Sequence, residues 1–219
     1  MMKINKTELV FILDRSGSMR GLESDTIGGF NTMLEKQKKE EGEALISTVL
    51  FDDQYELLHD RYDIQKVKPM SSEEYFVRGS TALLDAIGYT IHRIGNAQKY
   101  ATESQKADKV VVVITTDGME NASREYNYPM IQKMIARQKE KYGWEFIFLG
   151  ANIDAIATAA SFGIDEAHTS NFHADKVGME NTFSSMNEFL SNSRTDKEFN
   201  VNWKANVDQD FKKRNKGNN

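Results

Sequence analysis

Three short segments of the sequence carry side chains that could hold a hard metal ion. The first is Asp14-Arg15-Ser16-Gly17-Ser18, in which a carboxylate and two hydroxyls alternate around a glycine that permits a tight turn. The second is a loop with the hydroxyl of Thr81, and the third ends in the carboxylate of Asp117. Mg²⁺ prefers six oxygen ligands and keeps several waters, so hydroxyls with carboxylates bound directly or through water would suffice. The residue types therefore predict a magnesium-type site if the three segments meet.

Each segment also has a structural explanation when it is taken alone. Asp14 and its serines could form an Asx-turn with a helix cap, Thr81 could cap the helix that follows it, and Asp117 could be a turn residue. The expected strand order favours the metal site. Asp14 and Asp117 each end an apolar strand, and in a doubly wound sheet these strands are neighbours at the switch point, where ligands bind. The topology therefore brings the two carboxylates together.

The elements that must position these residues alternate between apolar, β-branched runs and segments of helical period. This alternation is typical of βαβ units around a mostly parallel sheet. The run Lys109–Thr116 contains four consecutive valines, as a parallel strand buried on both faces requires. Two strand-like runs separated by Asp53 and Gln54 predict a hairpin, and that turn also accounts for Asp52 and Asp53. Strands are expected over residues 8–14, 44–52, 55–64, 109–116, 144–149 and 167–170, and helices over 22–39, 82–98, 128–141, 153–162 and around 179–190.

The order and spacing of the chemical segments resemble a known family. Asp14-x-Ser16-x-Ser18, then Thr81, then Asp117 is similar to the metal-ion-dependent adhesion site (MIDAS) of the von Willebrand factor A (VWA) family. The resemblance extends from about Glu8 to Leu190. It implies a Rossmann-like, doubly wound α/β fold with a mostly parallel sheet, one antiparallel edge strand and helices on both faces.

The same resemblance implies how a metal would be held. Ser16, Ser18 and Thr81 would be direct ligands, with Asp14 and Asp117 bound directly or through water. The cofactor would be Mg²⁺ or Mn²⁺, and a Glu or Asp carboxylate of a partner protein would take the remaining position. After Asp117, the residues Gly-Met-Glu-Asn depart from the familiar rim of the site, which leaves the identity of the ligand open.

Two classes of function compete for this site. The first is a metal-dependent protein–protein interaction module with no chemistry at the metal, within a cytoplasmic multiprotein assembly. The alternative is an enzyme similar to haloacid-dehalogenase-like phosphotransferases, in which Asp14 would attack phosphate. Members of that family carry Asp-x-Asp at the end of the strand, and the second carboxylate is the general acid. This chain has Ser16 at that position. No phosphate-cradling Gly-x-x-x-x-Gly-Lys-[Ser/Thr], Gly-x-Ser-x-Gly or His-Glu-x-x-His occurs either, so the sequence favours binding over catalysis.

Composition limits the partners and the metal chemistry. The 219 residues include 28 basic and 33 acidic residues, and the net charge of -5 argues against nucleic acid as the main partner. No apolar run approaches the roughly 20 residues that cross a bilayer, and we expect no signal peptide, no membrane contact and a cytoplasmic location. There is no cysteine, and His168 and His173 lack a clear third ligand, so we expect no zinc site at these histidines.

The composition changes near the C-terminus. We expect a VWA-like domain over residues 1–193 and a polar, basic tail over residues 194–219, which carries 7 basic and 4 acidic residues. Apolar residues fall at every second position from Phe199 to Val207, a period that predicts a strand with one buried face. The asparagines between them are poor strand formers, so chance alternation is the competing interpretation. The composition of Lys212 to Asn219 predicts disorder.

Overall fold

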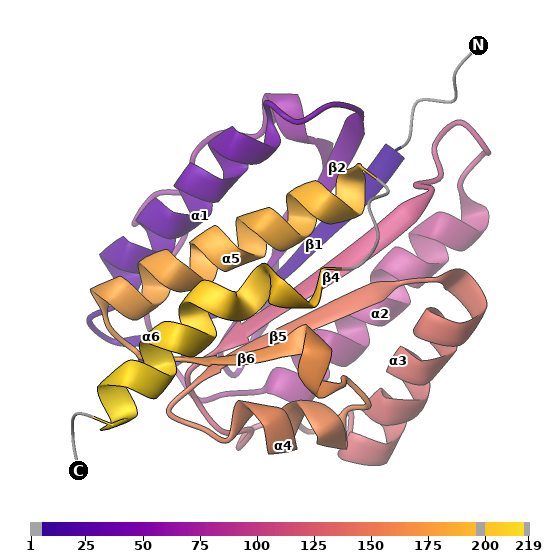
Figure 1. Ribbon diagram of the computed structural model, residues 1–219. Coiled ribbons are helices and arrows are strands. Elements are labelled where there is room, and N and C mark those ends of the chain that lie inside the picture. Colours follow the sequence, from indigo (N-terminus) through magenta and orange to yellow (C-terminus); the bar gives the residue numbers. More distant parts are fainter. Residues whose placement is uncertain (1–5, 196–199, 217–219) are drawn as a thin grey trace.

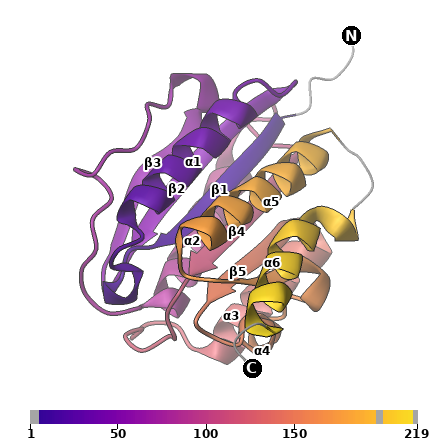
Figure 2. The same ribbon diagram turned by 60° about the vertical axis from the view of Figure 1, so that its left-hand side comes forward.

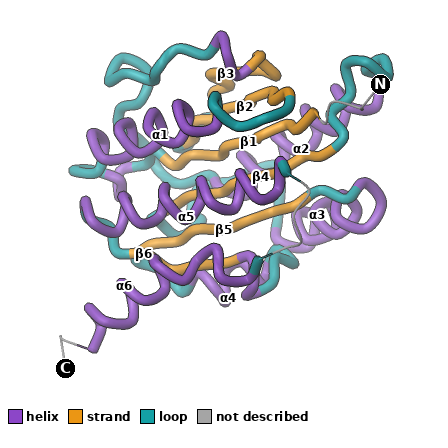
Figure 3. The backbone as a smooth tube through the Cα atoms, turned by 45° about the horizontal axis from the view of Figure 1, so that its top comes forward, coloured by secondary structure: helices purple, strands orange, loops and turns teal. Residues whose placement is uncertain are grey.

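A six-stranded sheet lies between two layers of helices (Figure 1). The computed structural model describes residues 6–195 and 200–216. The strand order is β3-β2-β1-β4-β5-β6 (Figure 3). Every neighbouring pair is parallel except β2 and β3. The predicted doubly wound sheet with one antiparallel edge strand is therefore confirmed. The strands are β1 (Lys6–Asp14), β2 (Glu43–Phe51), β3 (Tyr55–Asp63), β4 (Lys109–Thr116), β5 (Glu145–Ala151) and β6 (Thr169–Phe172).

Helices cover both faces of the sheet (Figures 1 and 2). The helices α1 (Glu23–Gln37), α5 (Lys176–Arg194) and α6 (Ala205–Lys216) lie on one face, and α2 (Leu83–Tyr100), α3 (Tyr128–Tyr142) and α4 (Ala155–Ser161) lie on the other. None of the helices in the described part of the chain is both long enough and apolar enough to cross a membrane.

The two helical layers enclose two separate apolar cores, because successive side chains of a strand point to opposite faces of the sheet. In β4, Val111 and Val113 pack toward α1 and α5, whereas Val110 and Val112 pack toward α2 and α3. All four valines are buried. The run of valines is thus explained by a central strand that is covered on both sides.

The predicted helices and strands up to α5 are confirmed, with ends that differ by a few residues. The helix α3 shows why some ends were predictable. Pro129 lies in its first turn, and the Asn127 side chain accepts a hydrogen bond from the backbone N–H of Met130. Gly143 ends the helix in the left-handed conformation, with a φ of 66°.

The prediction for the C-terminal segment is wrong in two respects. Residues Val201–Lys204 form a 3₁₀ turn and residues 205–216 form α6, so there is no strand in the described residues 200–207, and Lys212 to Arg214 are helical. Phe199 and residues 217–219 lie outside the described residues. Trp203 and Val207, which are four residues apart, are both buried, while Val201 is exposed. A helical period therefore overrides the alternating pattern.

The 3₁₀ turn and α6 pack against the rest of the domain. The indole N–H of Trp203 donates a 2.9 Å hydrogen bond to the carbonyl of Ala167, and the Trp203 ring lies edge-on to Phe189 of α5. The hydroxyl of Ser170 in β6 donates a 2.5 Å hydrogen bond to the Asp208 carboxylate. The division of the chain at residue 193 stays a prediction.

Candidate metal centre

Three hydroxyls from two separate segments converge beyond the carboxyl ends of β1 and β4. The hydroxyl oxygens of Ser16 and Ser18 are 3.0 Å apart. The Thr81 hydroxyl donates a 2.9 Å hydrogen bond to the Ser16 hydroxyl. Ser16 and Thr81 are buried, whereas Ser18 is exposed. The structure therefore brings together the three side chains that the sequence predicted as direct ligands.

Asp14 lies beneath these hydroxyls at the end of β1 and is buried. One carboxylate oxygen accepts a 2.7 Å hydrogen bond from the backbone N–H of Ser16, and the other accepts a 2.5 Å hydrogen bond from the Thr116 hydroxyl. The Asx-turn considered for this segment is thus present, but no side chain of the segment caps a helix there. Burial raises the pKa of the Asp14 carboxyl to about 6, although the bonds from Thr116 and Ser16 oppose the rise.

Asp117 has a different environment. It is 2% exposed, and neither of its carboxylate oxygens has a partner in hydrogen-bond geometry among the described residues. Burial raises the pKa of this carboxyl, and the nearby Ser18 hydroxyl offsets only part of the rise. An unpaired buried carboxylate is costly for a folded protein. A cation between Asp117 and the hydroxyls would remove that cost.

The residue after Asp117 leaves space beside the hydroxyls. A Cβ atom on Gly118 would lie 2.9 Å from the Ser18 hydroxyl oxygen and 3.0 Å from that of Thr81. These distances are too short for an undisturbed side chain, so only glycine keeps the approach to the two hydroxyls open. The backbone here thus forms one wall of a small cradle lined with oxygen atoms.

These residues fit a hard divalent cation. In the described part of the chain, no three His, Asp or Glu side chains cluster as metal ligands, so any ion at this edge would depend on the hydroxyls. Neutral hydroxyls and the two carboxylates of Asp14 and Asp117 are the oxygen donors that Mg²⁺ accepts, directly or through water. Because hydroxyls donate little charge, a bound ion would stay electrophilic toward an incoming anion.

The rim segment after Asp117, residues 118–121, holds Thr81 in place. This role was not predicted from the sequence. The Asn121 side chain accepts a 2.9 Å hydrogen bond from the backbone N–H of Thr81, and the N–H of Asn121 donates back to the Thr81 carbonyl at 3.0 Å. Glu120 accepts a 2.9 Å hydrogen bond from the N–H of Leu84 in the first turn of α2. The helix has Ala82 at its N-cap and no cap of its own, so Thr81 is not its cap. Glu120 supplies the missing acceptor from another loop.

An ion-pair cluster around the buried Asp52 carboxylate joins the first and second segments. The guanidinium of Arg15, which is fully buried, donates a 2.9 Å hydrogen bond to the Asp52 carboxylate, and Arg78 donates to the same oxygen at 2.7 Å. Burial alone would raise the pKa of Asp52, but bonds from Arg78, the Gln54 N–H and Arg15 together lower it. The hairpin turn is thus an incomplete account of Asp52, because its side chain fixes two site loops.

Backbone contacts complete this junction. The N–H of Gly17 donates to the carbonyl of Gly79 at 3.1 Å, and the N–H of Arg78 donates to the carbonyl of Arg15 at 2.9 Å. Gly79 has a φ of 65°, and a Cβ atom there would lie 2.1 Å from a carboxylate oxygen of Asp53. The two loops are therefore tied together before any metal binds.

The two histidines considered for zinc lie elsewhere and have other contacts. The Nδ1 atom of His168 lies 2.6 Å from the Asp165 carboxylate, and the Nε2 atom of His173 lies 3.4 Å from the carbonyl oxygen of Phe211 in α6.

Comparisons with known proteins agree with this fold. No protein-family model matches the chain, and no curated protein matches it. Three solved structures of proximal thread matrix protein 1 (PTMP1) from the mussel byssus are similar to it, with TM-scores of 0.57, 0.58 and 0.56 and 15% sequence identity. They cover 85%, 86% and 87% of this chain, and this chain spans 46% of theirs. One of them is described as having a zinc-occupied MIDAS motif.

The fold and the arrangement of the site define the class of structure. The strand order, the single antiparallel edge strand and the two helical layers of this chain match the architecture that the resemblance to the VWA family implied. The chain has a VWA-like fold. At 15% identity, the likeness establishes the fold alone.

Proposed function

We propose that this chain is a metal-dependent protein-interaction module. Mg²⁺ or Mn²⁺ would bind to the hydroxyls of Ser16, Ser18 and Thr81, with Asp14 and Asp117 bound directly or through water. The observation that carries the proposal is the buried carboxylate of Asp117, which has no hydrogen-bond partner among the described residues and lies beside the converging hydroxyls. A divalent cation is the group that would pair with it.

The charge of the site supports a carboxylate as the partner's ligand. Two protein carboxylates balance a divalent ion, while the hydroxyls add no charge, so an incoming Glu or Asp is still attracted by the field of the ion. The rim is suited to a protein surface, because Met119 and Phe76 are 74% and 42% exposed beside the site segments. Exposed apolar side chains around a charged centre are typical of protein interfaces.

The geometry argues against the phosphotransferase alternative. A nucleophilic carboxylate needs one oxygen free to reach phosphorus. Asp14 is 1% exposed, and its two oxygens accept hydrogen bonds from Ser16 and Thr116. Asp14 is therefore arranged to orient the loop, and we propose no chemistry at the metal.

The metal and the setting belong to the same proposal. The zinc-occupied MIDAS motif of a PTMP1 structure supports a divalent ion, and the hard oxygen donors of this chain favour Mg²⁺ or Mn²⁺. We place the module in a cytoplasmic multiprotein assembly, with a protein rather than nucleic acid or a membrane as its partner. The net charge of -5 supports that choice over nucleic acid.

Capture of the partner tests the proposal. The protein is immobilised and exposed to lysate of its source cell in Mg²⁺, with and without excess EDTA. A Thr81→Val variant keeps the shape of the side chain but loses the hydroxyl. Thr182→Val is the matched control, because Thr182 is also buried but lies on α5 and belongs to none of the three site segments. We expect a protein to be retained by the wild type and the control in Mg²⁺ only, and not by Thr81→Val. Retention of that protein by the wild type in EDTA, or to the same extent by Thr81→Val in Mg²⁺, would contradict the proposal.

A further inference from the structure

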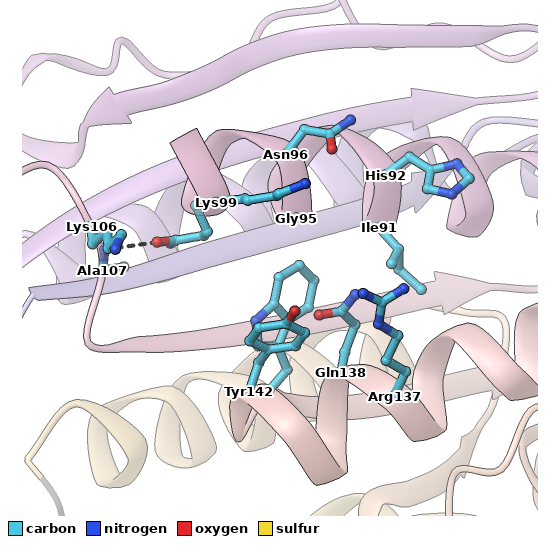
Figure 4. A pocket seen from close by; sticks show the side chains of 12 residues that line it. Ile91, His92, Gly95, Asn96, Lys99, Lys106, Ala107, Arg137, Gln138 and Tyr142 are labelled. Atoms are coloured by element: carbon cyan, nitrogen blue, oxygen red, sulfur yellow. Dashed lines mark hydrogen bonds between the residues drawn. The ribbon is translucent and has the colours of Figure 1, made fainter. Parts of the chain in front are cut away.

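A cavity lies at the opposite end of the sheet from the candidate metal centre. It has a volume of about 440 Å³ and lies between the C-terminal halves of α2 and α3 (Figure 4). Ala107 and Trp144, which line it, come just before β4 and β5, whereas Asp14 ends β1 and Asp117 directly follows β4. The eight residues of β4 separate the two sites by roughly 25 Å. The cavity therefore needs its own explanation.

The cavity is positively charged in an acidic protein. Lys99, Lys106 and Arg137 line it together with His92, and no Asp or Glu does. Lys106 pairs with Glu103, and the Lys99 ammonium lies over the ring of Tyr100. Such a concentration of cations, in a chain with a net charge of -5, would attract an anion.

Arg137 is the most informative of these cations. Its guanidinium projects from α3 into the space facing α2 (Figure 4), and no carboxylate pairs with it in the described residues. Lys99 is in the last turn of α2, where a cation stabilises the helix end, but Arg137 lies before the last turn of α3. A stabilised helix end thus does not explain Arg137.

The other lining groups suit a flat organic molecule. The rings of Tyr142 and Trp144 line the cavity, and Tyr142, which is half exposed, lies at one side of it (Figure 4). The side-chain amides of Asn96 and Gln138 also line it and form no hydrogen bond within the described part of the chain. Aromatic faces with a few polar groups are typical of small-molecule sites of 300–1,000 Å³.

We propose that this cavity binds a small organic phosphate with a flat ring, of the size of a nucleoside monophosphate. Arg137 would hold the phosphate by charge-assisted hydrogen bonds, with Lys99 and Lys106 adding charge. The ring would lie against Tyr142, and the amides of Asn96 and Gln138 would bond its polar edge. The site is independent of the metal centre.

Gly95 offers a way to close the cavity without removing charge. A Cβ atom there would meet only the Gln138 amide nitrogen, at 3.7 Å, so a leucine side chain would enter the cavity. Leucine also has a higher helix propensity than glycine, so Gly95→Leu should preserve α2. Arg137→Gln removes the charge instead, and Lys133→Gln is its matched control, because Lys133 is exposed on α3 and does not line the cavity.

Calorimetric titration of the full chain with adenosine monophosphate, adenosine and inorganic phosphate tests the proposal. We expect saturable binding of adenosine monophosphate with a Kd below about 1 mM, and binding at least tenfold weaker for the other two. Gly95→Leu should abolish it, Arg137→Gln should weaken it about tenfold, and Lys133→Gln, Thr81→Val and EDTA should leave it unchanged.

Three results would overturn the proposal. Absence of saturable binding of adenosine monophosphate would remove the site, and unchanged binding to Gly95→Leu would place it elsewhere. Equal affinity for inorganic phosphate would show that the ring takes no part. The same titration includes the metal-site variant Thr81→Val. A failure of the proposal for this cavity can therefore be distinguished from a failure of the proposed metal centre.

Discussion

Replacing Asp117 with asparagine should stabilise the metal-free protein while it removes the metal site. The Asp117 carboxyl is 2% exposed and has no hydrogen-bond partner in the described residues, so its charged form opposes folding. A buried polar group without a partner costs about 1–3 kcal/mol, and more when it is charged. Asparagine has almost the same shape without the charge, so we expect the free energy of unfolding to rise by about 2 kcal/mol at pH 8, where the raised pKa of Asp117 matters most.

Urea unfolding followed by tryptophan fluorescence measures this difference. With a slope of about 2–3 kcal/mol per molar urea, the midpoint of Asp117→Asn in EDTA should lie about 0.7–1 M above that of the wild type. Mn²⁺ should reverse the order. At a concentration of 100 times its Kd, the ion stabilises the wild type by about 2.7 kcal/mol, whereas the variant, which lacks the carboxylate, should gain little.

A second aspartate supplies the control. Asp154 is exposed and caps α4, accepting a 3.0 Å hydrogen bond from the N–H of Ala157, and asparagine caps helices equally well. Asp154→Asn loses the same charge and should change neither midpoint. The reasoning is refuted if Asp117→Asn is less stable than the wild type in EDTA, or if Mn²⁺ stabilises both proteins equally.

Three further changes test other parts of the structure. Burial raises the pKa of Asp14 to about 6, so protons compete with the metal for this carboxylate. The Mn²⁺ affinity measured by calorimetry should therefore fall about tenfold from pH 7 to pH 5 and be constant above pH 7. An affinity that is constant over the whole range would contradict this. The same raised pKa means that the folded, metal-free protein holds this proton more tightly than the unfolded chain, so its contribution to stability decreases as the pH rises from about 4 to about 6. Gly118→Ala places a methyl group 2.9 Å from the Ser18 hydroxyl oxygen and should weaken Mn²⁺ binding at least tenfold, while the circular dichroism spectrum stays that of the wild type. Trp203→Ala should lower the free energy of unfolding by about 3–5 kcal/mol in urea, because the ring is 1% exposed, and a loss below about 1 kcal/mol would show that the C-terminal segment contributes no packing.

The sheet, and the edge at which the candidate ligands meet, could be predicted from the sequence because both depend on local patterns and one topological rule. Four consecutive valines, as in β4, require a strand that is buried on both faces of the sheet. Parallel neighbours at the switch point then bring Asp14 and Asp117 to one edge, as the pairing of β1 with β4 confirms. Ser16, Ser18 and Thr81 follow from their positions in the loops at that edge.

The parts that the sequence did not predict depend on contacts between distant segments. Arg15 and Arg78 pair with the same buried carboxylate of Asp52, but the three residues lie in different loops, and no period or spacing links them. The hydrogen bond from Leu84 to Glu120 is of the same kind, since the acceptor at the start of α2 comes from the loop after β4. In such cases the sequence shows a charged loop residue without its partner.

The prediction of a strand in the C-terminal segment failed for another reason. Its alternation of apolar residues is compatible with a strand, yet the buried pair of Trp203 and Val207 fits a helix equally well. A pattern over nine residues does not separate the two periods. The outcome depends on the space above β6 and α5, which α6 fills.

The most direct test of the metal centre is calorimetric titration of Mn²⁺ into the wild type, Thr81→Val and Thr182→Val. Thr81 donates a 2.9 Å hydrogen bond to the Ser16 hydroxyl and is one of the three proposed hydroxyl ligands, whereas Thr182 is buried in α5. We predict one Mn²⁺ per chain for the wild type and for Thr182→Val, and an affinity at least tenfold weaker for Thr81→Val. Equal affinity in all three proteins, or no binding to the wild type, would contradict the account.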